Sequence, residues 1–189
     1  MRSRSNSHRP VLTWACVLCA VSLSVAALAR ETVLLNTSPA RDCYKAAADR
    51  GSSMDIETCT LAIEHQMLVP EDLAATYSNR GILYVRTGDL VAGLKDHDRA
   101  VALAPELASV YINRSNAFVA AKRYRDAMAD LERAIANAGE HLPIAYYNRA
   151  LMFKRLGDRE AARADAERAA ELAPETVAYR EFIQALTQQ

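Results

Sequence analysis

Ala-Thr-Tyr-Ser-Asn-Arg-Gly at residues 75–81, Ser-Val-Tyr-Ile-Asn-Arg-Ser at 109–115 and Ile-Ala-Tyr-Tyr-Asn-Arg-Ala at 144–150 are three versions of one short sequence. Their central tyrosines, Tyr77, Tyr111 and Tyr146, are 34 and then 35 residues apart. Self-similarity at this period indicates stacked copies of one supersecondary unit. The Ala- and Leu-rich composition, with few Gly and Pro, predicts that each unit is helical.

Each repeat divides into two predicted helices. In the first repeat these are residues 71–86 and 90–103, separated by Gly88-Asp89, where Gly ends one helix and Asp caps the next. The third repeat has Gly157-Asp158, but the middle one has Lys122-Arg123, so its turn is not signalled. Small residues recur at the predicted helix contacts, namely Gly81, Ser115 and Ala150 in the first helices and Gly93, Ala127 and Ala162 in the second.

The recurring order of aromatic residue, small residue, aromatic residue, Gly-Asp, Ala, Ala and Pro resembles the tetratricopeptide repeat over about 100 residues. The resemblance implies an all-α fold, a right-handed superhelical stack of antiparallel helix pairs whose concave face is lined by the first helices. We expect about nine helices, capped at both ends. Three units are expected within 71–174 (about 74–107, 108–142 and 143–174), after a degenerate hairpin at 40–70 and before a capping helix at 175–189.

Residues 1–29 are predicted to be a signal peptide. Three arginines and no acidic residue precede an apolar run from Val11 to Ala27, and Ala27-Leu28-Ala29 fits a cleavage site after Ala29. Residues 30–39 would then be a linker. The excess of Arg over Lys favours a bacterial source, so we expect an exported, periplasmic protein. An uncleaved leader would instead anchor it in the inner membrane.

The charge balance disfavours a nucleic-acid partner. The chain has 23 basic and 23 acidic residues, and removing the three leader arginines leaves a net charge of −3. No basic run offers a footprint for phosphates. A membrane partner is expected only if the leader is uncleaved.

Two cysteines remain after the leader, which contains Cys16 and Cys19. Cys43 lies eight residues before Gly51 and Cys59 eight residues after it, so both fall at the same level of the predicted hairpin. In an exported protein such a pair is expected to form a disulfide, which would stabilise the fold by about 3 kcal/mol. Two free buried thiols, or a pair of metal ligands, are the alternatives.

An Asn-Arg pair recurs in every first helix, and an Asp recurs in every second helix. One hypothesis is a structural ion pair in each unit, or a ladder between units: Arg80 with Asp96, Arg114 with Asp130, and Arg149 with Asp165. The other is that the asparagines line the concave groove and bind a peptide backbone. The candidate peptide-binding residues are Asn79, Asn113 and Asn148, with Ser78, Ile82, Asn116, Tyr147 and Leu151 as neighbours.

Some tetratricopeptide proteins bind a terminal carboxylate through a set that includes lysines. The matching first-helix positions here hold Ser78, Ile112 and Tyr147, which argues against that activity.

Catalysis has little support in the sequence. Asp96-His97-Asp98 resembles an acid–base set, but consecutive helical residues point about 100° apart. We therefore expect His97 to be a satisfied or half-exposed side chain. The histidines lack the spacing of a helical zinc site, so we predict no catalytic residue, no metal, no cofactor and no enzymatic activity.

These features predict an exported, non-enzymatic scaffold that binds a protein or peptide on the concave face of its repeats. The alternative is a structural or assembly component of the cell envelope, self-associating or anchored by its leader. We expect a monomer or a weak homo-oligomer.

Overall fold

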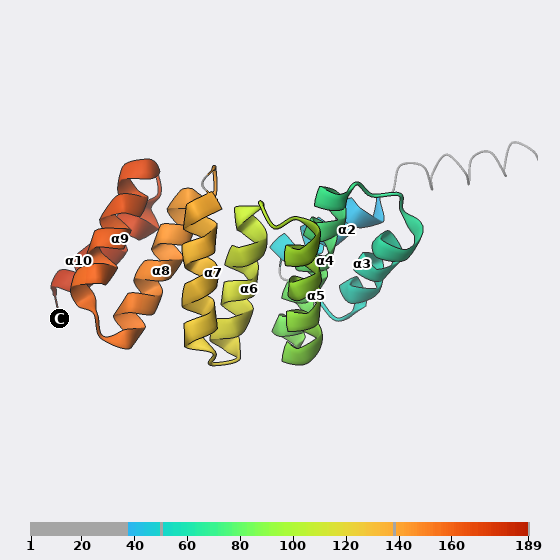
Figure 1. Ribbon diagram of the computed structural model, residues 1–189, viewed down its shortest axis with the longest axis horizontal. Coiled ribbons are helices and arrows are strands. Elements are labelled where there is room, and N and C mark those ends of the chain that lie inside the picture. The colour runs from blue at the N-terminus through green and yellow to red at the C-terminus, as the bar shows by residue number, and fades with distance from the viewer. Residues whose placement is uncertain (1–37, 50, 138, 189) are drawn as a thin grey trace, which may run out of the picture. The chain divides into compact units, whose positions relative to one another are not determined.

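The computed structural model describes residues 38–49, 51–137 and 139–188, and these residues form nine helices and no strand (Figure 1). The predicted signal peptide and most of the predicted linker lie outside the described residues. None of the nine helices is both long and apolar enough to cross a bilayer. The helices are α2 (Pro39–Ala48), α3 (Met54–His65), α4 (Pro70–Thr87), α5 (Leu90–Leu103), α6 (Ala108–Ala120), α7 (Tyr124–Asn137), α8 (Leu142–Leu156), α9 (Arg159–Leu172) and α10 (Val177–Thr187).

Consecutive helices pack in pairs: α2 with α3, α4 with α5, α6 with α7, and α8 with α9. Figure 1 shows the pairs following one another in chain order between Pro39 and the C-terminal helix. The first helices of adjacent pairs also touch, α2 with α4, α4 with α6, and α6 with α8. The predicted all-α stack of helix pairs is therefore confirmed for the described residues.

The turns inside the pairs follow one geometry. Gly88 and Gly157 have φ of 94° and 88°, in the left-handed region, and the carboxylates of Asp89 and Asp158 accept hydrogen bonds from the backbone of Ala92 and Ala161. The predicted stop and cap are thus confirmed in both turns. Lys122 takes the same left-handed conformation in the middle repeat, with φ of 59°.

Two prolines lie differently from the sequence-based expectation. Pro70 is in the first turn of α4, where its missing N–H costs nothing, so this helix begins one residue before the predicted start at 71. Pro105 has a residue type that favours the first turn of a helix, but it does not open α6. It lies instead in the connection before α6, which is closed by the hydrogen bond from Leu107 N to Ala104 O.

Small residues allow the helices of a pair to approach closely. A Cβ atom on Gly93 of α5 would lie 2.7 Å from Cγ2 of Val85 and 3.0 Å from the backbone oxygen of Gly81, both in α4. Glycine in a helix costs about 1 kcal/mol of stability relative to alanine, and at position 93 it permits the close contact between α4 and α5. At the other end of the stack, Phe182 and Leu186 of α10 cover the apolar face of the last pair.

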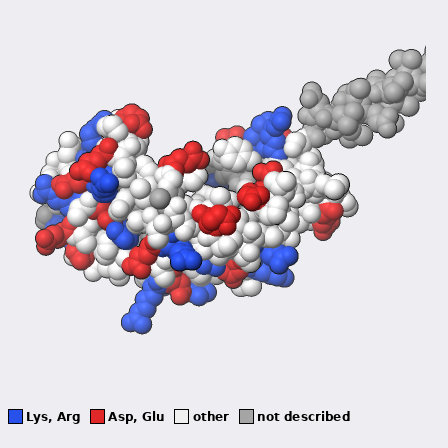
Figure 2. Space-filling model, turned by 45° about the horizontal axis from the view of Figure 1, so that its top comes forward, with Lys and Arg blue, Asp and Glu red and all other residues white. Residues whose placement is uncertain are grey.

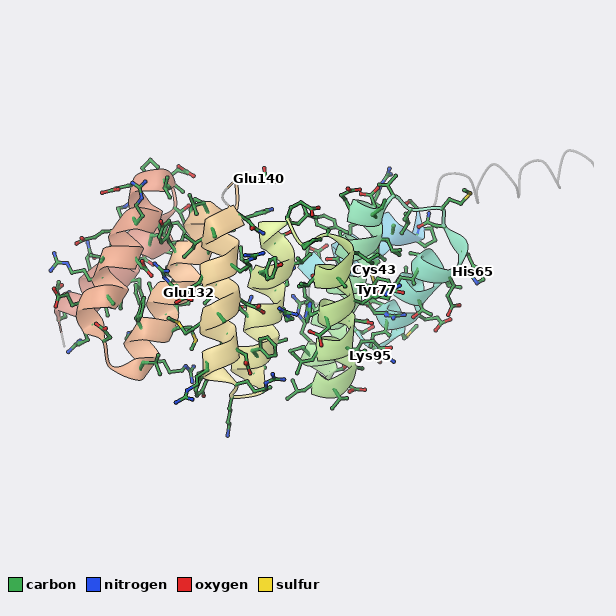
Figure 3. The ribbon with its side chains drawn as sticks, in the orientation of Figure 1. Cys43, His65, Tyr77, Lys95, Glu132 and Glu140 are labelled. Carbon is green, nitrogen blue, oxygen red and sulfur yellow. A yellow bond between two sulfur atoms is a disulfide. The ribbon has the colours of Figure 1, made fainter. Side chains whose placement is uncertain are left out.

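The first pair is joined by a disulfide between Cys43 of α2 and Cys59 of α3. Both residues are fully buried and pack with Leu83 of α4. The Cys43 sulfur also lies 3.9 Å from the carbonyl oxygen of Thr76 in α4. Tyr77, the next residue of α4, is labelled beside Cys43 in Figure 3. The bridge therefore lies at the contact between the first pair and the second.

Candidate functional site

Each repeat contains a two-point arginine–aspartate ion pair between its helices. Nε and Nη2 of Arg114 donate to the two carboxylate oxygens of Asp130 at 2.8 and 2.7 Å. Arg80 with Asp96, and Arg149 with Asp165, have the same arrangement at 2.7–3.0 Å. These hydrogen bonds raise the pKa of all three guanidinium groups, so the arginines are permanently charged.

The same arginines are packed between aromatic rings. The guanidinium carbon of Arg114 lies 5.8 Å from the centre of the Tyr111 ring and 5.5 Å from that of Phe118. Arg80 and Arg149 have equivalent ring pairs. Arg114 also donates to Asp98, on the preceding pair of helices, at 2.8 Å. Since each guanidinium is held on several sides, these residues act as structural links and present little surface to a ligand.

The asparagines beside these arginines line an open cleft of about 540 Å³, which we call the central cleft. Its walls come from the first helix of each pair, α2, α4, α6 and α8, because these helices lie next to one another along the stack. Of the candidate peptide-binding residues, it brings together Ser78, Asn79, Ile82, Asn113, Asn116 and Asn148. Residues not named as candidates also contribute, among them Tyr44 of α2, 62% exposed, and Ile144 of α8, 44% exposed.

Hydrogen bonds between helices hold the polar side chains of the cleft. The amide nitrogen of Asn113 donates to the Ser78 hydroxyl at 3.0 Å, and that of Asn148 donates to Oδ1 of Asn116 at 3.4 Å. Ser78 is itself buried. Asn113, Asn116 and Asn148 are therefore held in place before any ligand arrives.

Tyr147 does not lie in this set. Its ring packs against α10, with ring centres 4.8 Å from Tyr179 and 5.4 Å from Phe182. The sequence predicted that the last helix caps the third unit, but it did not indicate that this helix would cover Tyr147. That helix occupies the place beside α8 that a further first helix would take, and it covers Tyr147.

Two smaller pockets adjoin the central cleft. The α4–α6 pocket, about 340 Å³, lies between those two helices and reaches His97 of α5. The α6–α8 pocket, about 450 Å³, reaches Leu131 of α7 and includes the candidate Leu151. Asn116 contributes to both pockets and to the cleft, so the three form one continuous surface.

His97 differs from the sequence-based expectation of a satisfied or half-exposed side chain. It is 1% exposed, and its Nδ1 atom has no hydrogen-bond partner among the described residues. Burial, reinforced by the positive charge of Arg114, lowers the pKa of His97 to about 4. Gly81 provides the space for the imidazole, since a Cβ there would lie 2.9 Å from the ring.

The side chains of Asp96, His97 and Asp98 have separate environments. Asp96 binds Arg80 of α4, Asp98 binds Arg114 of α6, and His97 is buried in the core. Among the described residues, no group of three or more His, Cys, Asp or Glu side chains is arranged to hold a metal ion. The three neighbours thus form no acid–base set.

The buried histidine should make stability depend on pH. In the unfolded chain the pKa of a histidine is about 6.5, so between pH 6.5 and 4 the unfolded state binds a proton that native His97 does not. The free energy of unfolding should therefore fall as the pH falls, by about 2 kcal/mol at pH 5 relative to pH 7. Urea denaturation followed by circular dichroism at both pH values measures this loss.

The matched control is His97→Leu, which copies Leu131 at the equivalent position of the next repeat. His65 and His141 are present in both proteins, so the difference between the two pH dependences isolates His97. An equal loss of stability in both proteins would contradict the burial of a neutral imidazole.

The face in Figure 2 shows acidic and basic side chains interspersed, without one continuous basic surface. Glu140, at the edge of the stack in Figure 3, is one of the exposed acids near the cleft residue His141. This face offers no obvious footprint for a polyanion.

Comparisons with known proteins agree with the fold. The sequence profile of the tetratricopeptide repeat matches residues 144–176. Tetratricopeptide repeat protein 36 of Homo sapiens is 35% identical over 96 residues, which are 49% of this chain and 51% of that protein. The chain thus matches only about half the length of this curated relative.

Two solved structures have similar helix stacks. The first TPR of Spaghetti (RPAP3), bound to the HSP90 peptide SRMEEVD, has a TM-score of 0.58 at 22% identity, over 62% of this chain and 95% of that one. YrrB, a TPR protein with an unusual peptide-binding site, has a TM-score of 0.57 at 25% identity, over 69% and 65%. With the repeat period and the helix pairing, these similarities show that the chain has the tetratricopeptide-repeat fold.

Proposed function

We propose that this protein is a non-enzymatic scaffold that binds an extended segment of a protein or peptide in the central cleft. The observation that carries the proposal is the row of Asn79, Asn113, Asn116 and Asn148 along one cleft formed by the first helices. Carboxamides can donate to and accept from a peptide backbone, while the partly exposed Ile144 and Tyr44 offer apolar contact.

Preorganisation favours binding at this site. Asn113 and Asn148 are already held by Ser78 and Asn116, so little side-chain entropy is lost when a ligand binds. The peptide bound to RPAP3 and the peptide-binding site of YrrB show that similar helix stacks take such ligands. These precedents support the class of partner and do not identify it.

We also propose that the scaffold works outside the cytoplasm, in a bacterial periplasm. Two features support this location: the signal-peptide pattern of residues 1–29, and the disulfide between Cys43 and Cys59. Mass spectrometry of the exported protein tests this location. A chain that begins at Arg30 would support export with cleavage, whereas a chain in the membrane fraction that retains residues 1–29 would favour the anchored alternative.

The double variant Asn113→Ala/Asn148→Ala tests the binding site. Peptides selected from a random library on the purified wild-type chain should bind this variant about tenfold or more weakly, because two preset amides are lost. Its melting temperature should change by only a few degrees, since each asparagine makes one hydrogen bond at the cleft. Fluorescence anisotropy and thermal unfolding measure the two effects.

Asn137→Ala is the control variant. Asn137 lies on α7, outside the cleft, and its side chain donates to the carbonyl of Pro105 at 3.1 Å. The alanine variant therefore also loses one side-chain hydrogen bond. Its peptide affinity should remain at the wild-type level. A large fall in melting temperature for the double variant, with peptide affinity intact, would assign the asparagines to the fold.

A further inference from the structure

The continuous surface formed by the central cleft and its two adjoining pockets has no described Asp or Glu in its lining. Three cations do line it, Arg86 in the α4–α6 pocket and Lys154 and Arg155 in the α6–α8 pocket. The chain as a whole has 23 basic and 23 acidic residues. The continuous surface therefore has an excess of positive charge that the whole chain lacks.

The three cations have no carboxylate partner among the described residues. Nη1 of Arg155 donates to the Tyr124 hydroxyl at 3.3 Å, and Nζ of Lys154 lies 5.3 Å from the centre of the Phe182 ring. A neutral hydroxyl and an aromatic ring hold these side chains without neutralising their charge. The arginines of the three ion pairs between helices, by contrast, are already matched by aspartates, so the cations of the pockets are the ones available to an anionic ligand.

The α6–α8 pocket combines its two cations with an apolar wall. The wall comes from three helices and consists of Val119, Leu131, Leu151 and Met152. Leu131 and Met152 are buried, whereas Leu151 is 41% exposed and so remains accessible to a ligand. An apolar side chain would cover this wall, and a carboxylate next to it would meet a cation of the same pocket.

The cations of both pockets lie at the same end of their helices. Arg86 is in the last turn of α4, and Lys154 and Arg155 are in the last turn of α8. The first turn of α4 instead contains the acidic residues Glu71 and Asp72, and α8 has no acidic residue in its first turn. The carboxylates of a ligand are therefore expected along the edge formed by the last turns.

A nucleic acid matches this surface less well than a peptide does. Sites for single strands combine a continuous basic groove with aromatic side chains on which the bases stack. Neither pocket has a Phe, Tyr or Trp in its described lining, and the side chains between the cations are aliphatic or uncharged polar groups. Separate cations with an apolar wall suit a peptide that has both acidic and apolar side chains.

We propose that the bound segment is acidic: an apolar side chain enters the α6–α8 pocket beside a carboxylate that pairs with Lys154 or Arg155, and a second carboxylate pairs with Arg86. Asn116 lines both pockets, so one segment in the cleft reaches both. Packed helices are about 8–10 Å apart and α6 separates α4 from α8, so the two carboxylates should lie about five or six residues apart in an extended segment. The inference rests on peptide binding in the central cleft and adds the chemistry of the partner.

The test compares two double variants that remove the same net charge. The pocket variant, Lys154→Gln/Arg155→Gln, removes both cations of the α6–α8 pocket. The matched control, Lys95→Gln/Arg99→Gln, removes two exposed cations of α5 that line neither the cleft nor its pockets, and Lys95 is labelled in Figure 3. Cooperative thermal unfolding verifies that both variants are folded.

Short random peptides are selected on the purified wild-type chain and on each variant. Wild type and the control should enrich the same peptides, with Asp or Glu beside an apolar residue and a second acid about five or six positions away. The pocket variant should lose the preference for the acid beside the apolar residue and keep the other. Arg86→Gln should lose the second acid and keep the first.

A peptide selected on wild type is then compared by fluorescence anisotropy with its Glu→Gln form, in which the acid beside the apolar residue is neutralised. Wild type should bind the glutamate form about threefold to fivefold more tightly, as expected of a partly solvated ion pair, and the pocket variant should bind both forms alike. Added salt should reduce the difference in wild type. Amidation of the peptide's C-terminus should leave its affinity unchanged, because the cations pair with side chains.

The possible failures are distinct. A wild-type selection without acidic residues, or an equal loss of the acidic preference in both double variants, would overturn the acidic subsites and leave cleft binding intact. A large loss of affinity on amidation would assign the cations to a chain terminus, and tighter binding of a single-stranded oligonucleotide than of any selected peptide would assign them to nucleic acid; either result overturns the proposal. If no peptide binds wild type better than it binds Asn113→Ala/Asn148→Ala, both the subsites and the proposed function are overturned.

Discussion

Replacing Asp130 with alanine is expected to lower the free energy of unfolding by about 3 kcal/mol. Asp130 is 5% exposed and accepts two hydrogen bonds from Arg114. Without Asp130, the Arg114 guanidinium stays between the Tyr111 and Phe118 rings, in a side chain that is only 18% exposed. Asp98 is then its one remaining carboxylate partner. Loss of one member of a buried pair typically costs about 3–5 kcal/mol, and the remaining bond to Asp98 places this case at the lower end. Urea denaturation measures the change.

Asp98→Ala is the matched control, because Asp98 binds the same arginine at a similar distance but its side chain is 64% exposed. Solvent screens this pair, so its loss should cost less than about 1 kcal/mol. Equal losses from the two variants would show that burial does not decide the strength of the pairs. A loss below 1 kcal/mol from Asp130→Ala would contradict the structural role that we assign to the three arginines.

The repeat period was the strongest predictor of the fold. A spacing of about 34 residues, with Gly-Asp between two helical patterns, predicts helix pairs and their turns from local backbone chemistry alone. The pairing of Arg114 with Asp130, and its equivalents in the other repeats, also follows from counting residues outward from the turn. These features are local, or they are copied between repeats, so the sequence carries them directly.

The turn of the middle repeat could not be predicted in the same way. Lys122 is not a residue that favours positive φ, yet it adopts the left-handed conformation. The hydrogen bonds from Lys122 N to Val119 O and from Arg123 N to Phe118 O match those from Gly88 N to Val85 O and from Asp89 N to Tyr84 O. The packing of the helix pair imposes this turn, and the amino acid at the position does not reveal it.

The candidate site was predicted in part. Ser78 and Ile112, which match Tyr147 in the repeat, both line the central cleft, whereas Tyr147 packs against Tyr179 and Phe182 of α10 and lies outside it. His97 matches the core residue Leu131, and that register signalled a buried imidazole despite its polarity. The missing hydrogen-bond partner and the α4–α6 pocket depend on three helices together, which no local pattern encodes.

Removing the disulfide is expected to lower the free energy of unfolding by about 3 kcal/mol, because the bridge closes a separation of 16 residues. Ala46 and Ala62 stand 34 residues before Arg80 and Asp96, so the first helix pair lacks the ion pair of the repeats that follow. Urea denaturation of Cys43→Ala/Cys59→Ala measures the loss.

Reductant provides the matched control, since it should destabilise the wild-type chain and leave the double variant unchanged. The effect should also be local: hydrogen exchange should rise in α2 and α3 and remain slow in α6 to α9, because each pair contacts mainly its neighbours. Since Tyr44 of α2 lines the central cleft, the affinity for selected peptides should fall as α2 loosens. Peptide mapping that finds both cysteines as free thiols would contradict the bridge, and unchanged exchange in α2 after reduction would show that packing against α4 alone holds this helix in place.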